Sequence, residues 1–165
     1  TAVDAALDLA LRELLSTCFT KPEDVVFRER RYFAEPPAHR WMIRNPEGQV
    51  VAHIAAHQRR VEAGAWSAPA GGLAEVCVHP GSRGQGLVRL LLKAVHADLQ
   101  ERGCLFSVLF GDPRFYSSSG YVKPDPVFIG PGPDGRWIPA DGIMVRPLSQ
   151  LAWPAGEVHV PGLIF

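Results

Sequence analysis

A glycine-rich turn at residues 79–86 has the residue types best suited to chemistry in this sequence. Hydrophobic residues before it and an amphipathic segment after it predict a strand that enters the turn and a helix that leaves it. Gly84 and Gly86 let a backbone approach a bulky anion, and Arg83 adds a full charge with two-pronged hydrogen bonding. A helix N-terminus adds unpaired N–H groups and roughly half a positive charge. The turn predicts a phosphate site, although a tight connection without a ligand would show the same pattern.

Residue types exclude two familiar phosphate loops. A nucleotide P-loop needs Gly-Lys-Ser or Gly-Lys-Thr after its spacer residues, and no such tripeptide occurs. The dinucleotide fingerprint needs a third glycine where Arg89 stands. The predicted site is therefore of another kind.

The strand before the turn offers an acid–base group. Alternation places Glu75, Cys77 and His79 on one face, and Val76 and Val78 on the other. A carboxylate between apolar walls has a raised pKa, as a general base needs, so Glu75 is the first candidate base. A strand-end carboxylate paired with an arginine is the equal alternative.

Two histidines on the preceding predicted strand, His53 and His57, are further candidates for the base or for contact with a substrate. A structural role in a half-buried strand is the alternative for each. The thiol of Cys77 could carry an acyl group, but no histidine partner can be assigned to it.

Two ordered motifs resemble the GNAT superfamily of N-acetyltransferases. Residues 76–88 are similar to its acetyl-CoA motif, a hydrophobic strand ending near proline and then Arg/Gln-x-x-Gly-x-Gly/Ala opening a helix. Residues 106–110 look like the following strand, and residues 114–121 resemble the family's Phe-Tyr, three residues, Gly, aromatic signature. The resemblance covers roughly residues 50–122.

Subgroup features are also recognisable. Residues 52–60 and 83–88 resemble the aminoglycoside 2′-N-acetyltransferases, and residues 153–156 resemble the C-terminus of rhizobial nodulation N-acyltransferases. Val88 departs from the superfamily pattern, since Gly or Ala is usual there, and its side chain would crowd a pyrophosphate pocket.

The resemblance implies a fold and a cofactor. The fold is α/β (α+β), with a mixed, mostly antiparallel central sheet of six to seven strands, splayed between the fourth and fifth, and helices on both faces. The cofactor is acetyl-CoA or another acyl-CoA, with its pantetheine arm on the fourth strand and its pyrophosphate on the amides that follow. The implied cofactor-binding residues are Val76, Cys77, Val78, Arg83, Gly84, Gln85, Gly86, Leu87 and Val88.

Further roles follow from the same resemblance. Tyr116 matches the family tyrosine that donates a proton to the leaving CoA thiolate, which suits a phenol of pKa about 10, with packing on the sheet as the alternative. Asp112 could contact the acceptor or cap a helix. Glu157, His159 and the Phe165 carboxylate could line the acceptor site, because the tails of the subgroups fold back toward the cleft.

The implied activity is transfer of an acetyl group from acetyl-CoA to a primary amine of a small molecule, by direct attack through a ternary complex. A longer-chain N-acyltransferase and a non-catalytic acetyl-CoA-binding domain are the alternatives, and an interaction module without cofactor is a more distant one. A homodimer is a further expectation, because relatives often dimerise.

Periodicity predicts the helices that position these residues. Apolar residues at three- and four-residue steps predict a first helix that ends at Lys21-Pro22, with Thr1 and Asp4 as an acidic capping box. A second stripe predicts a helix from the glycine turn to about Arg102, ended by Gly103. Short helices are also expected at residues 23–32 and 112–119.

Strands account for most of the rest. We expect an antiparallel meander, then a strand buried on both faces, then a hairpin with a long irregular arm. The apolar, proline-interrupted tail stays unassigned. The expected strands are residues 40–44, 49–61, 65–78, 104–110, 121–129 and 142–145.

Bulk composition limits the function classes. The 165 residues suit one domain, residues 1–165. Lys plus Arg and Asp plus Glu are both 17, so a general nucleic-acid binder is not expected. Cys18, Cys77 and Cys104 fit no metal spacing and indicate a reducing compartment. Without a long apolar run or a basic leader, we expect a cytoplasmic protein with no membrane span.

Overall fold

The computed structural model describes residues 3–124, 126–132 and 134–162. Its strands form one sheet in the order β6-β5-β8-β2-β3-β4-β7, with β1 paired to β2 beside this path. The β3–β4 and β5–β8 pairs are parallel and the other named strand pairs are antiparallel. The strands are β1 (His39–Arg44), β2 (Val50–Ala63), β3 (Trp66–Val78), β4 (Phe106–Phe110), β5 (Val127–Gly130), β6 (Ile138–Pro139), β7 (Ile143–Pro147) and β8 (Val158–Pro161).

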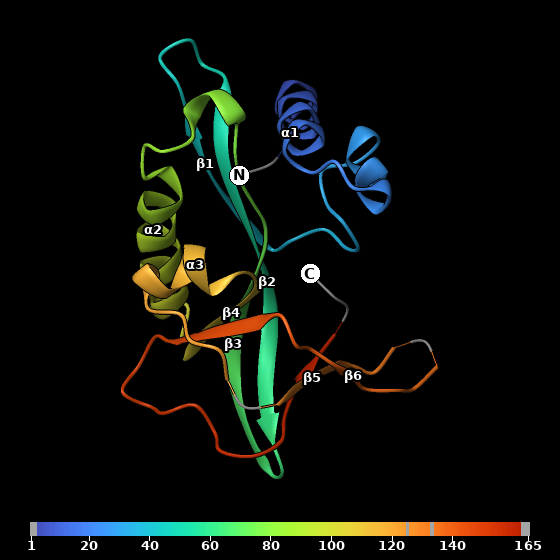
Figure 1. Cartoon of the computed structure of the whole chain (residues 1–165), viewed down its shortest axis with the longest axis vertical. Coiled ribbons are helices and arrows are strands. Elements are labelled where there is room, and N and C mark those ends of the chain that lie inside the picture. The colour runs from blue at the N-terminus through green and yellow to red at the C-terminus, as the bar shows by residue number, and fades with distance from the viewer. Residues whose placement is uncertain (1–2, 125, 133, 163–165) are drawn as a thin grey trace.

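Helices cover both faces of the long β2–β3 pair, as Figure 1 shows for α1 and α2. The α-helices are α1 (Ala5–Cys18), α2 (Leu87–Glu101) and the short α3 (Pro113–Tyr116), and 3₁₀ turns occupy Pro22–Arg28, Pro80–Ser82 and Ser117–Ser119. This mixed sheet with helices on both faces confirms the predicted fold class. Leaving out the two-residue β6, the described sheet also has the expected number of strands.

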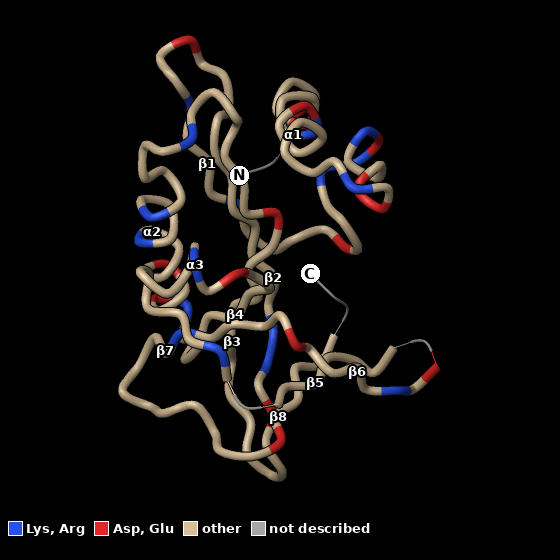
Figure 2. The backbone as a smooth tube through the Cα atoms, in the orientation of Figure 1, with Lys and Arg blue, Asp and Glu red and all other residues tan. Residues whose placement is uncertain are grey.

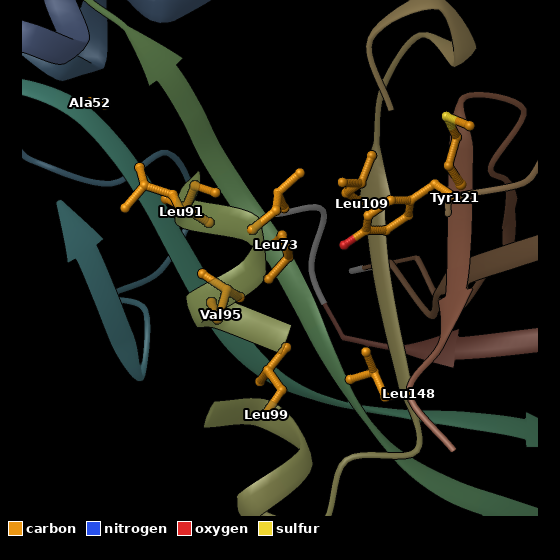
Figure 3. Packing of buried hydrophobic residues seen from close by; sticks show 12 residues of the cluster. Ala52, Leu73, Leu91, Val95, Leu99, Leu109, Tyr121 and Leu148 are labelled. Carbon is orange, nitrogen blue, oxygen red and sulfur yellow. The ribbon is translucent and has the colours of Figure 1, made fainter. Parts of the chain in front are cut away.

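Helix α2 is held by the apolar stripe that predicted it. Leu91, Val95 and Leu99 of α2 share one cluster with Leu73 of β3, and Tyr121 lies beyond Leu73, next to Leu109 (Figure 3). Fully burying one such aliphatic side chain contributes about 1.5–3 kcal/mol. The stripe therefore fixes the start of α2, and with it the glycine turn, against the end of β3.

Helix α1 packs on the opposite face. Its buried residues Leu11, Leu14 and Leu15 share a cluster with Cys77 of β3. The predicted capping box is not the one observed, because Asp4 itself is the N-cap and its side chain accepts from the Leu7 amide at 2.8 Å. Thr1 lies outside the described residues. The packing brings Cys18, the last residue of α1, to the end of β3.

The expected splay lies between β3 and β4, which take the places of the predicted fourth and fifth strands. Residues 70–73 of β3 pair with residues 106–109 of β4, and residues 74–78 have no strand partner on that side among the described residues. The half-buried side chains of Val76, Val78 and Tyr116 pack on the α2 side of this gap. The end of β3 therefore has a free edge.

The C-terminal part differs from the predicted hairpin, which is wrong. β5 pairs with β6 and β8, whereas β7 pairs with β4 and only Val122 bridges to Val145. Pro124 and Pro126 cannot donate ladder hydrogen bonds, so the strand expected over residues 121–129 is reduced to β5. The unassigned tail supplies β8, which lies between β5 and β2.

Charges of both signs are interspersed along the chain, including on α1 and α2 (Figure 2). Among the described residues, no helix combines the length and hydropathy needed to cross a bilayer. The same residues contain no cluster of three or more His, Cys, Asp or Glu side chains arranged for a metal ion.

Candidate active site

A cavity of about 490 Å³ lies where β3 separates from β4. The end of α1, the end of β3, the glycine turn with the start of α2, and α3 all contribute to its wall. Eight of the nine sequence-predicted cofactor residues and the predicted acid are among the lining side chains: Val76, Cys77, Val78, Arg83, Gly84, Gly86, Leu87, Val88 and Tyr116. Gln85 belongs to the same turn but does not line the cavity.

The glycine turn exposes a set of backbone amides. Gly84 and Gly86 have φ values of 77° and 72°, a region that side-chain-bearing residues rarely adopt. Gly86 is the N-cap of α2 and offers no side-chain acceptor, so the first-turn amides of Leu87, Val88 and Arg89 have no intrahelical partner. The turn is therefore shaped to receive an anion at the helix N-terminus.

Arg83 bends back from this turn toward β3. Its Nε donates to the Val78 carbonyl at 3.4 Å, and the Cys18 thiol donates to the same oxygen at 3.3 Å. The Val78 carbonyl therefore points away from β2 and into the cavity. The exposed guanidinium of Arg83 adds positive charge at the mouth of the cavity.

Tyr116 lies in the cavity wall as a protonated phenol. Its ring packs edge-on against Tyr121, with centroids 6.0 Å apart. Burial, with a smaller contribution from Cys77, raises the pKa of Tyr116 to about 12. The neutral hydroxyl can therefore donate a proton at ordinary pH.

Gly111 makes room for that ring. A Cβ at Gly111 would lie 2.6 Å from Tyr116 Cδ2 and closer still to Cε2. Its φ is not in the left-handed region, so space rather than backbone conformation requires glycine here. Sequence reasoning gave Gly111 no role, because the ring and the glycine are five residues apart and meet only in the folded turn.

A β-bulge marks the point where β3 leaves β4. Two residues of β3, Glu75 and Val76, oppose the single residue Ile54 of β2. Glu75 has a φ of 45°, in the left-handed region that is uncommon for a residue with a side chain. The predicted strict alternation along this strand is interrupted at the candidate base.

The Glu75 carboxyl faces the loop after the first 3₁₀ turn. Its Oε1 accepts from the Phe33 amide at 3.1 Å, and its buried Oε2 has no partner among the described residues. Burial raises the pKa of Glu75, against the lowering effects of the Phe33 hydrogen bond and of Arg40. The Glu75 side chain does not line the cavity, although Val76, the next residue of β3, does. A ligand in the cavity would therefore not contact the Glu75 carboxyl directly.

The two histidines lie elsewhere. His53 is fully buried; Arg40 donates to its Nε2 at 2.9 Å, and its Nδ1 lies 2.9 Å from the Glu75 carbonyl, which assigns that nitrogen as the donor. Burial, then Arg40, lowers the pKa of His53 to about 3, so it is neutral and anchors the bulge. His57 lies 3.6 Å from Glu35 at a separate cavity, and burial lowers its pKa to about 4.

Three other predicted acceptor residues, Asp112, Glu157 and His159, also lie outside the cavity wall. Asp112 caps α3 through the Arg114 amide at 2.8 Å and pairs with the Arg114 guanidinium at 2.6 Å, and these hydrogen bonds lower its pKa. Glu157 and His159 lie 3.3 Å from each other at β8. Phe165 lies outside the described residues.

Four lining residues received no site role from the sequence: Cys18, Phe19, Ser82 and Phe115. Phe115 stands within the second motif and is 70% exposed. Cys18 continued the apolar stripe of the first helix and so was indistinguishable from a core residue.

The chain matches a family model described as an acetyltransferase (GNAT) domain over residues 8–123. A comparison with curated proteins gives no significant match.

Solved structures with this fold include the GNAT family N-acetyltransferase YhbS from Escherichia coli in complex with CoA. It is 23% identical, with a TM-score of 0.71 over 96% of this chain and 87% of that one. A GNAT family acetyltransferase from Brucella melitensis in complex with acetyl-CoA is 20% identical, with a TM-score of 0.64 over 94% and 90%. The ribosomal-protein-S18-alanine N-acetyltransferase from Escherichia coli is 18% identical, with a TM-score of 0.60 over 92% and 94%. In some larger matching proteins, this chain covers only about 30% of the length.

Proposed function

The chain belongs to the family of GNAT acetyltransferase domains, and on that premise we propose that it is an N-acetyltransferase. It moves an acetyl group from acetyl-CoA to a primary amine of a small-molecule acceptor, by direct attack within a ternary complex. The observation that supports this most strongly is the meeting of three features at one cavity: the free edge of β3, the open amides of the glycine turn and the protonated Tyr116.

The cavity residues fit an acyl-CoA. The amides of residues 84–88 and the Arg83 guanidinium suit a pyrophosphate, because they combine open donors with positive charge. The free backbone edge at Val76 suits an amide-containing arm such as pantetheine. Acetyl-CoA would supply an acetyl group already activated as a thioester. The two CoA-bound relatives of the same fold support this choice of donor.

Two side chains, Tyr116 and Glu75, transfer protons in the proposed reaction. Tyr116 supplies a proton to the departing thiolate, since its hydroxyl stays neutral up to a pKa of about 12. Glu75 receives the proton of the amine by way of water, since its carboxyl has a raised pKa and an unpartnered oxygen but does not reach the cavity wall. His53 acts through Glu75 by holding the bulge carbonyl.

A longer acyl chain is the second candidate donor group. Phe19, Leu87 and Val88 give the cavity apolar walls, and the exposed Phe115 stands at its edge. Acyl-CoA thioesters of increasing chain length, compared at fixed acceptor, distinguish the two donors. A maximum of kcat/KM at acetyl supports an acetyltransferase, and a maximum at longer chains supports an acyltransferase.

Release of free CoA thiol from acetyl-CoA, measured across a panel of small amines, tests the activity. We expect amine-dependent release that Tyr116→Phe lowers about 100-fold in kcat, with little change in acetyl-CoA affinity. Tyr32→Phe is the matched control, because Tyr32 lies outside the cavity, and it should leave kcat unchanged. Acetyl-CoA binding without thiol release from any amine would instead support a non-catalytic binding domain.

A further inference from the structure

Two thiols meet inside the proposed acyl-CoA cavity. Cys18 is the last residue of α1 and Cys77 belongs to β3, and both line the cavity. The Cys18 thiol donates at 3.3 Å to the carbonyl of Val78, the residue that follows Cys77, and Cys18 packs against the hydrophobic cluster to which Cys77 belongs. Both cysteines are free thiols in the structure.

We propose that Cys18 and Cys77 form an oxidisable pair, converted by hydrogen peroxide to a disulfide that closes the acyl-CoA cavity. The pairing rests on the shared position of both cysteines in the cavity wall and on the 3.3 Å hydrogen bond from the Cys18 sulfur to the residue next to Cys77. The further step, that the disulfide excludes acyl-CoA from the cavity, rests on the proposed function.

The surroundings assign different roles to the two sulfurs. A hydrogen bond from Cys77 and the nearby Arg83 lower the pKa of Cys18 to about 7, against the effect of burial. The hydrogen bond with Cys18 and burial raise the pKa of Cys77. Glu75 adds negative charge near Cys77, and Tyr116 faces it as a neutral phenol. Cys18 is therefore the nucleophile and Cys77 the resolving thiol.

The chemistry balances in two steps. The Cys18 thiolate attacks one peroxide oxygen, the O–O bond breaks, and Cys18 becomes a sulfenic acid while the departing hydroxide is protonated to water. The Cys77 sulfur then attacks the Cys18 sulfur, the S–O bond breaks, and the proton of Cys77 leaves with that oxygen as a second water. Two thiols lose two electrons in total, and one peroxide is reduced to two waters.

The product changes the part of the cavity that an acyl-CoA would use. A disulfide ties the end of α1 to β3 beside Val78, next to the free strand edge and Tyr116. Cys18 is the last residue of its helix, so its backbone can shift with little loss of helix hydrogen bonding. Because acetyl-CoA and the disulfide exclude each other, the factor by which the disulfide weakens acetyl-CoA binding is also the factor by which bound acetyl-CoA disfavours the disulfide at equilibrium.

Peptide mapping without reductant tests the pair directly and needs no ligand. Wild-type protein treated with hydrogen peroxide should yield a Cys18–Cys77 linked peptide, with the loss of two hydrogens, and dithiothreitol should reverse it. Cys104→Ser should behave as wild type, since half-buried Cys104 lies outside this cavity, and Cys18→Ser should give no link. A Cys18 found only as sulfinic or sulfonic acid, or linked to Cys104, overturns the proposal.

Ligand binding tests the second half of the proposal. Acetyl-CoA affinity should fall at least about tenfold on oxidation and return on reduction. Saturating acetyl-CoA should slow link formation, because it occupies the cavity that both thiols line. Unchanged affinity in protein shown to contain the link overturns the closure. If the reduced protein does not bind acetyl-CoA, the proposed function is wrong, and so is the proposal that the disulfide excludes acyl-CoA. Peptide mapping then still shows whether Cys18 and Cys77 form a disulfide.

Discussion

Replacing Gly111 with alanine should displace the Tyr116 ring without changing the tyrosine itself. The added Cβ would lie 2.6 Å from Tyr116 Cδ2 and 2.9 Å from Leu109 Cδ1. Carbon atoms pack favourably at about 3.5–4.0 Å, so the ring must retreat by about 1 Å. Tyr116 lines the cavity through this ring, so the displacement moves the proposed acid away from the reacting atoms.

The expected effect falls on kcat. Misplacing a catalytic group by about 1 Å can cost about 100-fold in rate. Forcing a methyl group into a packed site costs about 1–3 kcal/mol of stability, which urea unfolding would measure. Thiol-release kinetics should show kcat lowered about 100-fold with acetyl-CoA affinity nearly unchanged, since the amides of the glycine turn are not displaced.

Two comparisons make the result specific. Gly142→Ala is the matched control, because a Cβ there would meet only Phe110 at an ordinary 3.6 Å. Combined with Tyr116→Phe, Gly111→Ala should cost little further activity, since both changes remove the same proton donor. A fully active Gly111→Ala enzyme, or losses that multiply in the double variant, would refute the assignment of Tyr116.

Three further predictions follow from charges and pKa values. Arg83→Glu should weaken acetyl-CoA binding about 10- to 100-fold in calorimetry, because it places a negative charge beside the open amides. The control Arg136→Glu changes an exposed arginine away from this cavity and should leave the affinity unchanged. Equal affinities in the two variants would count against pyrophosphate binding at the glycine turn. With a weakly basic acceptor, kcat should rise with pH as the Glu75 carboxyl, whose pKa is raised, loses its proton. Ionisation of Tyr116 should not lower kcat below a pH of about 12. Glu75→Gln should abolish the rise, and an unchanged pH profile in this variant would show that Glu75 is not the base. His53 has a folded-state pKa of about 3 against an ordinary 6.5, so between these values the unfolded chain binds a proton that the folded chain does not. Its contribution to stability is therefore complete above pH 6.5 and falls as the pH is lowered toward 3, by up to about 1.4 kcal/mol per pH unit, and urea unfolding should show a smaller pH dependence in His53→Gln than in wild type.

Local signals predicted the elements that hold the cavity. The stripe of α2, the glycine at its end and the Asp112-Pro113 start of α3 each depend on neighbours a few residues away, and each appears where the sequence placed it. β8 could not be predicted in this way, because a four-residue strand in a proline-interrupted tail depends on β5 and β2 for its pairing.

The site itself was predictable where a motif is continuous in sequence. Residues 83–88 and Tyr116 were identified from their resemblance to the GNAT motifs, and all of them except Gln85 line one cavity. The bulge at Glu75 was not, since nothing in a regular-looking strand announces a left-handed residue. The contact of Cys18 with Cys77 was not predictable either, because it depends on how α1 lies across the sheet.

Amide hydrogen exchange with and without acetyl-CoA tests the central claim most directly, because that claim concerns backbone N–H groups. We predict saturable protection concentrated at residues 84–88 and at Val76, with little change at exposed turns such as residues 45–48. Saturable binding that leaves the amides of the glycine turn unprotected would contradict the account.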